Sequence, residues 1–278
     1  MEIRINDVLY SLNELDIKSS TNIKMKELIL KTNNQKLMTC DILIKNGCLV
    51  TWETEVKNGD EIYMLKKGEV PSKEEMEMFL KARHSPSVHE KLKNATVGIA
   101  GLGGLGSNIA MQLARVGVGN LIICDFDVID PTNLNRQNYF IDHIGMKKTD
   151  CTKEILNKIN PYINVVNYDI RLDISNFESC FKSCDIIVEA FDNPVCKAEL
   201  TNWVLMNTNK HIVAASGMAG YYSSNTIKTK KISDRFYLTG DLVSEAKEFD
   251  GLMAPRVGIV ASHQSNCVLR ILMNELEV

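Results

Sequence analysis

The stretch GIAGLGGLGSN, residues 98–108, breaks an apolar run with closely spaced glycines and then resumes with the apolar spacing of a helix. In a strand–turn–helix unit, glycines allow the sharp turn and let a phosphate approach main-chain N–H groups at the positive end of the helix. We therefore predict a nucleotide-binding loop shaped by Gly101, Gly103, Gly104 and Gly106.

Strand and helix patterns alternate from this loop to the C-terminus. Apolar runs predict strands at 95–101, 120–127, 163–170, 184–192 and 210–217, and helical spacing predicts helices at 105–116, 147–160 and 256–275. The later strands have the near-continuous apolar content of sheets that are covered on both faces. We therefore predict an α/β fold, with a Rossmann-like, mostly parallel sheet and helices on both faces, in a domain spanning residues 95–278.

The first 94 residues have a different pattern. Alternating and turn-flanked segments predict strands at 2–6 and within 45–68, with a helix around 23–31 between them. Residues 1–67 are therefore predicted to form a small α+β domain. Residues 68–94 are predicted to form a helical connector, because Ser72 followed by Glu74 is typical of a helix start and Pro86 precedes a second short helix.

Composition and charge exclude several classes of protein. The formal net charge is −3, and the chain has no basic run of the kind that binds nucleic acid. No apolar segment approaches the roughly 20 residues that span a bilayer, and the N-terminus has no basic start followed by an apolar stretch. We therefore expect a cytoplasmic protein that binds neither nucleic acid nor membrane. The eight cysteines form no C-x-x-C pair, so we expect no zinc site.

The residues beyond the glycine loop bear on which nucleotide is bound. Asp125 follows at the end of the next predicted strand, where an acid binds the ribose of NAD, so an NAD-dependent oxidoreductase is one interpretation. However, Arg136 and Lys148 each follow shortly after the carboxyl end of a strand, where ligands bind in such sheets. Converging cations suit a triphosphate with about four negative charges better than they suit a dinucleotide.

Four motifs together resemble those of the ThiF/MoeB/HesA superfamily, the ubiquitin-activating-enzyme-like adenylyltransferases. They are GLGGLGSN (101–108), DFDVIDPTNLNRQ (125–137), GMKK (145–148) and AFDN (190–193), and the similar region covers about residues 95–270. The segments HEKLKNATVGIAGLGGLGSN and GLMAPRVGIVASHQSN are most similar to the ThiF branch, which serves thiamine thiazole synthesis.

The resemblance implies how ATP is held. It implies that the four glycines shape the loop under the nucleotide and that Asp125 holds the ribose hydroxyls. Asn133 and Arg136 match residues that contact the phosphates, and Lys148 matches a second cation beside them.

The resemblance also implies a metal ion and a paired assembly. Asp192 matches the acid that positions Mg²⁺ near the α-phosphate, and Asn193 stands beside it. Members of this family form homodimers, and an arginine before the first strand often reaches into the neighbouring subunit's site. Arg83 is the candidate for that arginine, although its surroundings differ from the usual pattern.

The reaction implied is attack by a carboxylate on the α-phosphate of ATP, which gives an acyl adenylate and pyrophosphate. A carboxylate is already ionised at neutral pH, so positioning and cations suffice without a general base. The resemblance implies that the substrate is the C-terminal glycine of a ThiS-like sulfur carrier protein. Several relatives carry a cysteine for sulfur transfer after the last main strand; residues 219–253 contain none, so we predict adenylation alone.

Residues 1–67 themselves resemble a β-grasp sulfur carrier. A working carrier ends in a free Gly-Gly, whereas this segment continues into the connector, so it is not a substrate. Docking of the true carrier, assistance in dimerisation and a purely structural role stay open for it. Three other functions also stay open for the whole chain: adenylation of a different sulfur carrier of the molybdopterin type, NAD-dependent oxidoreduction, and non-catalytic nucleotide binding by a scaffold protein.

Overall fold

The computed structural model describes residues 2–6, 8–11, 15, 23–248 and 250–278. The chain divides into two units, Met1–Glu90 and Lys91–Val278. The larger, C-terminal unit contains the predicted glycine loop, and the smaller, N-terminal unit has a sheet of its own.

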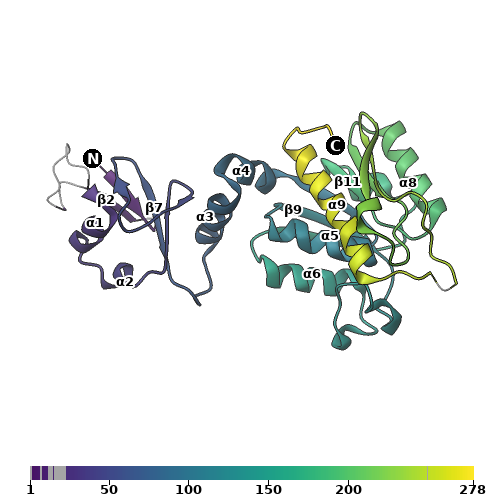
Figure 1. The fold of residues 1–278 in the computed structure, drawn as a ribbon, viewed down its shortest axis with the longest axis horizontal. Coiled ribbons are helices and arrows are strands. Elements are labelled where there is room, and N and C mark those ends of the chain that lie inside the picture. The colour runs from purple at the N-terminus through teal and green to yellow at the C-terminus, as the bar shows by residue number, and fades with distance from the viewer. Residues whose placement is uncertain (1, 7, 12–14, 16–22, 249) are drawn as a thin grey trace. The chain divides into compact units, whose positions relative to one another are not determined.

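A seven-stranded sheet forms the centre of the larger unit (Figure 1). Its strands are β8 (Thr96–Ala100), β9 (Asn120–Asp125), β10 (Asn164–Asp169), β11 (Ile186–Glu189), β12 (His211–Ala215), β13 (Lys228–Ser233) and β14 (Phe236–Gly240). Their order is β10-β9-β8-β11-β12-β14-β13, and within it only β13 runs antiparallel to its neighbour. The predicted apolar strands are therefore all present as parallel neighbours.

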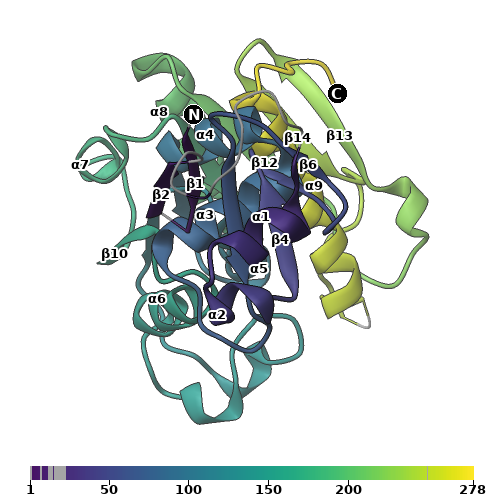
Figure 2. The same cartoon turned by 90° about the vertical axis from the view of Figure 1, so that its left-hand side faces the viewer.

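Helices cover both faces of this sheet (Figure 1). One face carries α5 (Gly104–Arg115), α6 (Lys148–Ile159) and α9 (Ala254–Leu272), and the other carries α7 (Phe177–Phe181) and α8 (Pro194–Asn207). On the second face, Phe177 and Trp203 belong to the same buried cluster as Ile187 and Ile212 of the central strands. α9 also contacts β13 and β14 (Figure 2). The predicted Rossmann-like fold class is confirmed.

Short 3-10 helices add to the described part of the larger unit. They lie at Pro131–Asn133, Ile141–His143 and Ser224–Thr226. Among the described residues, the structure contains no helix that is both long and apolar enough to cross a membrane.

The smaller unit contains a mixed sheet of order β2-β1-β7-β4-β5. Its elements are β1 (Glu2–Ile5), β2 (Val8–Ser11), β3 (Ile23–Lys24), α1 (Met25–Lys31), α2 (Gln35–Met38), β4 (Ile42–Lys45), β5 (Cys48–Leu49), β6 (Glu55–Val56), β7 (Glu61–Leu65), α3 (Lys73–His84) and α4 (Pro86–Asn94), the last of which ends just beyond the unit. β1 pairs antiparallel with β2 and parallel with β7, and α1 contributes Met25, Leu28 and Ile29 to the core. This is the β-grasp arrangement predicted for the segment.

The helix start predicted at Ser72 is confirmed by a capping box. The Ser72 hydroxyl accepts the N–H of Glu75 at 3.2 Å, and the Glu75 carboxylate accepts the N–H of Ser72 at 2.8 Å. The second short helix begins at Pro86, also as predicted. Met78 of α3 packs in a cluster with Tyr63 of β7, so α3 is part of the smaller unit.

Candidate active site

A cavity of about 740 Å³ lies at the carboxyl ends of the parallel strands of the larger unit. The order of strands reverses between β8 and β11, because β9 and β10 follow on one side of β8 while β11 and β12 follow on the other. Such a switch point is where ligands bind in open α/β sheets. The cavity therefore lies where a nucleotide is expected.

The glycine loop forms one wall of the cavity through Gly101, Gly103 and Gly104. Gly101 has a φ of 94°, and an added Cβ would lie 2.9 Å from the carbonyl oxygen of Ala190. Gly106 is not among the described residues that line the cavity, and an added Cβ there would lie 1.8 Å from the Gly101 carbonyl oxygen. Gly106 therefore allows α5 to pack closely on the loop and Gly101 allows the close approach of Ala190, while an added Cβ at Gly103 would meet no atom closer than 3.8 Å.

Asp125, the last residue of β9, lies buried in the wall of the cavity. Its Oδ2 accepts the N–H of Leu102 at 2.6 Å, and its Oδ1 accepts the N–H of Asp127 at 2.8 Å. Burial raises the pKa of Asp125, and Lys148 together with these two N–H groups opposes that rise. Two backbone donors thus fix the carboxyl group, and each oxygen keeps a second lone pair that a ligand hydroxyl can use.

Lys148 begins α6 and is buried, with 5% of the residue exposed. Its Nζ donates to Oδ2 of Asp127 at 2.7 Å, and both residues line the cavity. Asp127 was not predicted as the partner of Lys148, although its spacing of two from Asp125 is visible in the sequence. The pair places one cation at the cavity wall beside two acids.

Arg136 lines the cavity and follows a 3-10 turn that Asn133 stabilises. The Asn133 Oδ1 accepts the N–H of Asp130 at 3.1 Å, and the Asn133 carbonyl oxygen accepts the N–H of Arg136 at 3.1 Å. Asn133 is not among the described lining residues. In this structure Asn133 shapes the turn that presents the Arg136 guanidinium.

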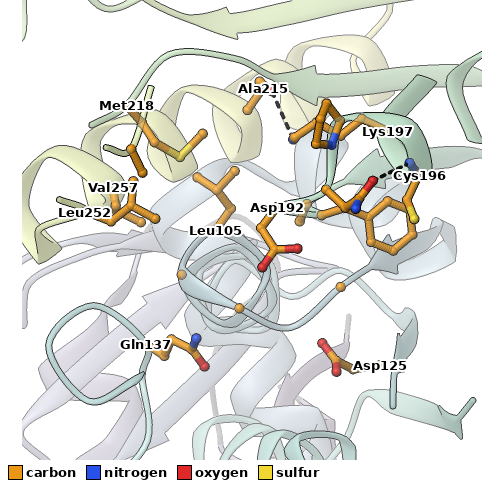
Figure 3. Close-up of a pocket in the computed structure, with 18 of the residues that line it drawn as sticks. Leu105, Asp125, Gln137, Asp192, Cys196, Lys197, Ala215, Met218, Leu252 and Val257 are labelled. Carbon is orange, nitrogen blue, oxygen red and sulfur yellow. Dashed lines mark hydrogen bonds between the residues drawn. The ribbon is translucent and has the colours of Figure 1, made fainter. Parts of the chain in front are cut away.

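Asp192 follows β11 and comes to the cavity across the glycine loop from Asp125 (Figure 3). Asn193 also lines the cavity. The exposed Asp192 carboxylate points into the cavity (Figure 3). The Asn193 Oδ1 accepts the N–H groups of Val195 and Cys196 at 2.9 and 3.2 Å, which caps the start of α8. Asn193 therefore anchors the turn from which Asp192 projects.

Asp192, the acid predicted to hold Mg²⁺, is suited to a metal ion that is also held by the phosphates of a nucleotide. Among the described residues, no group of three or more His, Cys, Asp or Glu side chains converges to cage a metal. Mg²⁺ is usually held by one or two carboxylates together with substrate phosphates and water. The Asp192 carboxylate, in a cavity whose wall also carries Lys148 and Arg136, supplies the protein's part of such a donor set.

The structure brings most of the predicted site residues together. Gly101, Gly103, Gly104, Asp125, Arg136, Lys148, Asp192 and Asn193 line one cavity. Arg83 is exposed near the C-terminal end of α3 in the smaller unit, and its action on a partner subunit stays a prediction.

The cysteines that stand four residues apart are core residues. Cys180 and Cys184 are each 2% exposed and share a buried cluster with Cys124, so both contribute to the packing of the core. Cys196 instead lines the cavity in the first turn of α8, which the sequence analysis did not anticipate.

Two buried ion pairs beside the cavity were also missed. Lys197 Nζ lies 3.0 Å from Oε1 of Glu189, and Arg256 Nη2 lies 2.5 Å from Oδ2 of Asp241. Each pair joins different elements of the larger unit. The only signal in the sequence was a charged residue inside an otherwise apolar strand or helix.

Arg256 of α9 holds together two loops that border the cavity. Its guanidinium donates to the carbonyl oxygens of Tyr222 and Ser223 at 2.8 and 2.9 Å as well as to Asp241. Burial alone raises the pKa of Asp241, but hydrogen bonds, led by that from the Ser244 N–H, lower it to about 2. The Asp241 carboxylate is therefore charged and doubly anchored at neutral pH.

We expect Asp241→Asn to lower the free energy of unfolding by about 3 kcal/mol at pH 7, because it leaves the buried Arg256 without its counter-charge. Since folding lowers the pKa of Asp241 from 3.8 to about 2, its contribution is present above pH 3.8 and is lost as the pH falls toward 2. Urea denaturation at several pH values measures this. The exposed Asp234→Asn is the control, with a change under about 0.5 kcal/mol; equal losses in both variants would contradict the prediction.

The amino-acid sequence matches the ThiF family over residues 78–278. Curated relatives include proteins named adenylyltransferase and sulfurtransferase UBA4. That of Kluyveromyces lactis is 38% identical over 129 residues, which are 46% of this chain and 29% of the relative. That of Vanderwaltozyma polyspora is 32% identical over 189 residues, which are 66% of this chain and 43% of the relative. The chain thus spans less than half the length of these relatives.

Solved structures have a similar fold. E. coli tRNA N6-threonylcarbamoyladenosine dehydratase, TcdA, in complex with AMP, superposes with a TM-score of 0.66 at 19% identity, over 75% of this chain and 98% of that one. E. coli MccB with ATP superposes with a TM-score of 0.55 at 25% identity, over 73% of this chain and 62% of that one. The similarity to TcdA concerns the fold alone.

Proposed function

Because this chain belongs to the ThiF family, we propose that it is an ATP- and Mg²⁺-dependent adenylyltransferase acting on the C-terminal glycine carboxylate of a ThiS-like sulfur carrier. One observation carries the proposal: the glycine loop, a ribose-type acid, two cations and a metal-type acid all open into one cavity at the switch point of the sheet. The pyrophosphate of NAD carries fewer negative charges than a triphosphate, so NAD-dependent chemistry would not account for two cations, Arg136 and Lys148, at the site.

Each of these residues has a part in binding or in charge stabilisation. The backbone of the loop and the start of α5 receive phosphate oxygens, and Asp125 accepts hydrogen bonds from the ribose hydroxyls. Arg136 and Lys148 stabilise the charge that develops on the phosphates as the carrier's carboxylate attacks. Mg²⁺, when bound at Asp192, neutralises phosphate oxygens. The nucleophile is already ionised, so none of these residues has to remove a proton.

The far side of the cavity suits the narrow tail of a carrier protein. The segment at the end of β12 that lines it, residues 215–219, reads ASGMA, and four of its five side chains are small or absent. Small side chains leave room along this wall, so the extended tail of a carrier that ends in glycine can lie against it. These residues therefore support a carrier terminus as the source of the carboxylate.

The identity of the carrier is the finer part of the proposal. The sequence resembles the ThiF branch, so a ThiS-like carrier in thiamine thiazole synthesis comes first. The relatives named adenylyltransferase and sulfurtransferase favour a carrier of another sulfur pathway as the second candidate. We also propose that two copies of the chain pair, with Arg83 acting on the partner subunit's site.

Carrier-dependent exchange of labelled pyrophosphate into ATP tests the function. We expect exchange with Mg²⁺ and a ThiS-like carrier, and none when the carrier lacks its terminal glycine, because that carboxylate is the nucleophile. Supplying carriers of the ThiS and molybdopterin types side by side separates the two candidates. ATP binding without exchange for any carrier would favour a non-catalytic scaffold, and binding of NAD but not ATP would favour an oxidoreductase.

A further inference from the structure

A buried ion pair lies directly behind the Asp192 turn. Glu189, the last residue of β11, is fully buried, and both of its carboxylate oxygens lie 3.0 Å from Nζ of Lys197 on α8. The same Nζ donates to the carbonyl oxygen of Ala215, the last residue of β12, at 3.1 Å (Figure 3). Three acceptors match the three N–H donors of a lysine ammonium. Lys197 lines the cavity, but its protons are committed to the protein.

The pair fixes the backbone on which Asp192 stands. Glu189 Oε1 also accepts the N–H of Phe191 at 2.7 Å, which bends the chain between the end of β11 and Asp192. On the other side of Asp192, the N–H of Lys197 donates to the carbonyl oxygen of Asn193 in the first turn of α8. Residues 189–193 are thus held at one end by the ion-paired Glu189 carboxylate and at the other by the backbone of α8, the helix that carries the Lys197 side chain.

α9 also holds β11 and β12, the two strands that the ion pair contacts. Gln264 is fully buried, and its Nε2 donates to the carbonyl oxygens of Glu189 and Val213 at 3.0 and 3.1 Å. The ends of β11 and β12 therefore cannot shift apart easily. Because these strand ends are held in place, a small displacement of the ion pair would be passed on to the turn that carries Asp192.

We propose that Glu189 and Lys197 are positioning residues that hold the Asp192 carboxylate where it shares Mg²⁺ with ATP. The inference rests on the proposed function, since it uses Asp192 as the metal ligand. Neither residue touches the reacting atoms. Partners that orient a metal ligand commonly change metal affinity by about 10- to 100-fold when they are mutated.

Calorimetric titration with ATP, with and without Mg²⁺ and with no carrier present, tests the positioning. We expect Lys197→Met and Glu189→Gln to reduce the Mg²⁺-dependent gain in ATP affinity by about tenfold. ATP affinity in EDTA should stay within about twofold of wild type, because the nucleotide-contacting residues are untouched. Lys197→Arg keeps the charge and should retain most of the gain.

A double variant, Glu189→Gln with Lys197→Met, separates the loss of Asp192 positioning from the loss of stability caused by an unpaired buried charge. Removing both charges should restore the thermal stability that either single change loses, since a neutral pair needs no counter-charge. The Mg²⁺-dependent gain should nevertheless stay low. Full gain in Lys197→Met and in the folded double variant would overturn the proposal. Pyrophosphate exchange tests adenylation and this titration tests the pair, so the two proposals can fail separately.

Discussion

Replacing Asp192 by alanine is expected to lower the rate of carrier-dependent pyrophosphate exchange by about 1,000-fold. Its carboxylate projects into the cavity across the glycine loop from Asp125, where a metal ion shared with the phosphates would lie (Figure 3). Without it, Mg²⁺ would reach the site only as it is carried by ATP, and the Asp192 position would supply no carboxylate to hold it. Initial rates at saturating ATP, carrier and Mg²⁺ measure the loss.

A matched control lies on the following helix. Glu199 is an exposed acid of α8 that does not line the cavity within the described part of the chain. Glu199→Ala should keep the exchange rate within about twofold, as a surface change away from the site does. ATP affinity measured in EDTA should be similar in both variants. An Asp192→Ala protein that exchanges pyrophosphate at a near-normal rate would remove Asp192 from the mechanism.

The parallel strands β8 to β12 were predictable because runs of apolar residues mark buried strands, whereas the parallel strand β14 was not predicted. β8 and β11 consist almost entirely of buried apolar residues, so their content alone marks them as strands covered on both faces. β13 was missed because it reads KTKKIS and lies at the sheet edge, where one face and one side meet solvent. The packing of α3 on the smaller sheet was missed for another reason: it depends on Met78 meeting β7, which no local pattern encodes.

The site was predictable where its residues belong to contiguous motifs. Asp125, Arg136 and Asp192 each follow the end of a strand, and parallel strands bring their carboxyl ends to one edge. A motif alone does not give the role of each glycine. The spacing of Gly106 matches the phosphate-binding glycines, but the structure places it in contact with the Gly101 backbone. The Glu189–Lys197 pair was not predicted because its meaning depends on the burial of Glu189, which only the packed core creates.

Replacing Lys148 by methionine is expected to lower kcat/KM for ATP by about 1,000-fold, through both KM and kcat. The ammonium is buried at the cavity wall and pairs with Asp127 at 2.7 Å, next to Asp125. Its loss removes a cation from the phosphates and leaves two acids facing them, so the local charge becomes more negative by one unit. ATP saturation curves for pyrophosphate exchange measure both constants.

The neighbouring lysine provides a control for this prediction. Lys147 is about half exposed and pairs with Asp169, and neither is among the described residues that line the cavity. Lys147→Met should therefore leave kcat/KM within about twofold. Adding Asp127→Asn to Lys148→Met should recover about tenfold, because it removes an unpaired acid that repels the phosphates. Equal effects of the two lysine substitutions, or no recovery in the double variant, would show that the Lys148–Asp127 pair does not set the charge of the ATP site.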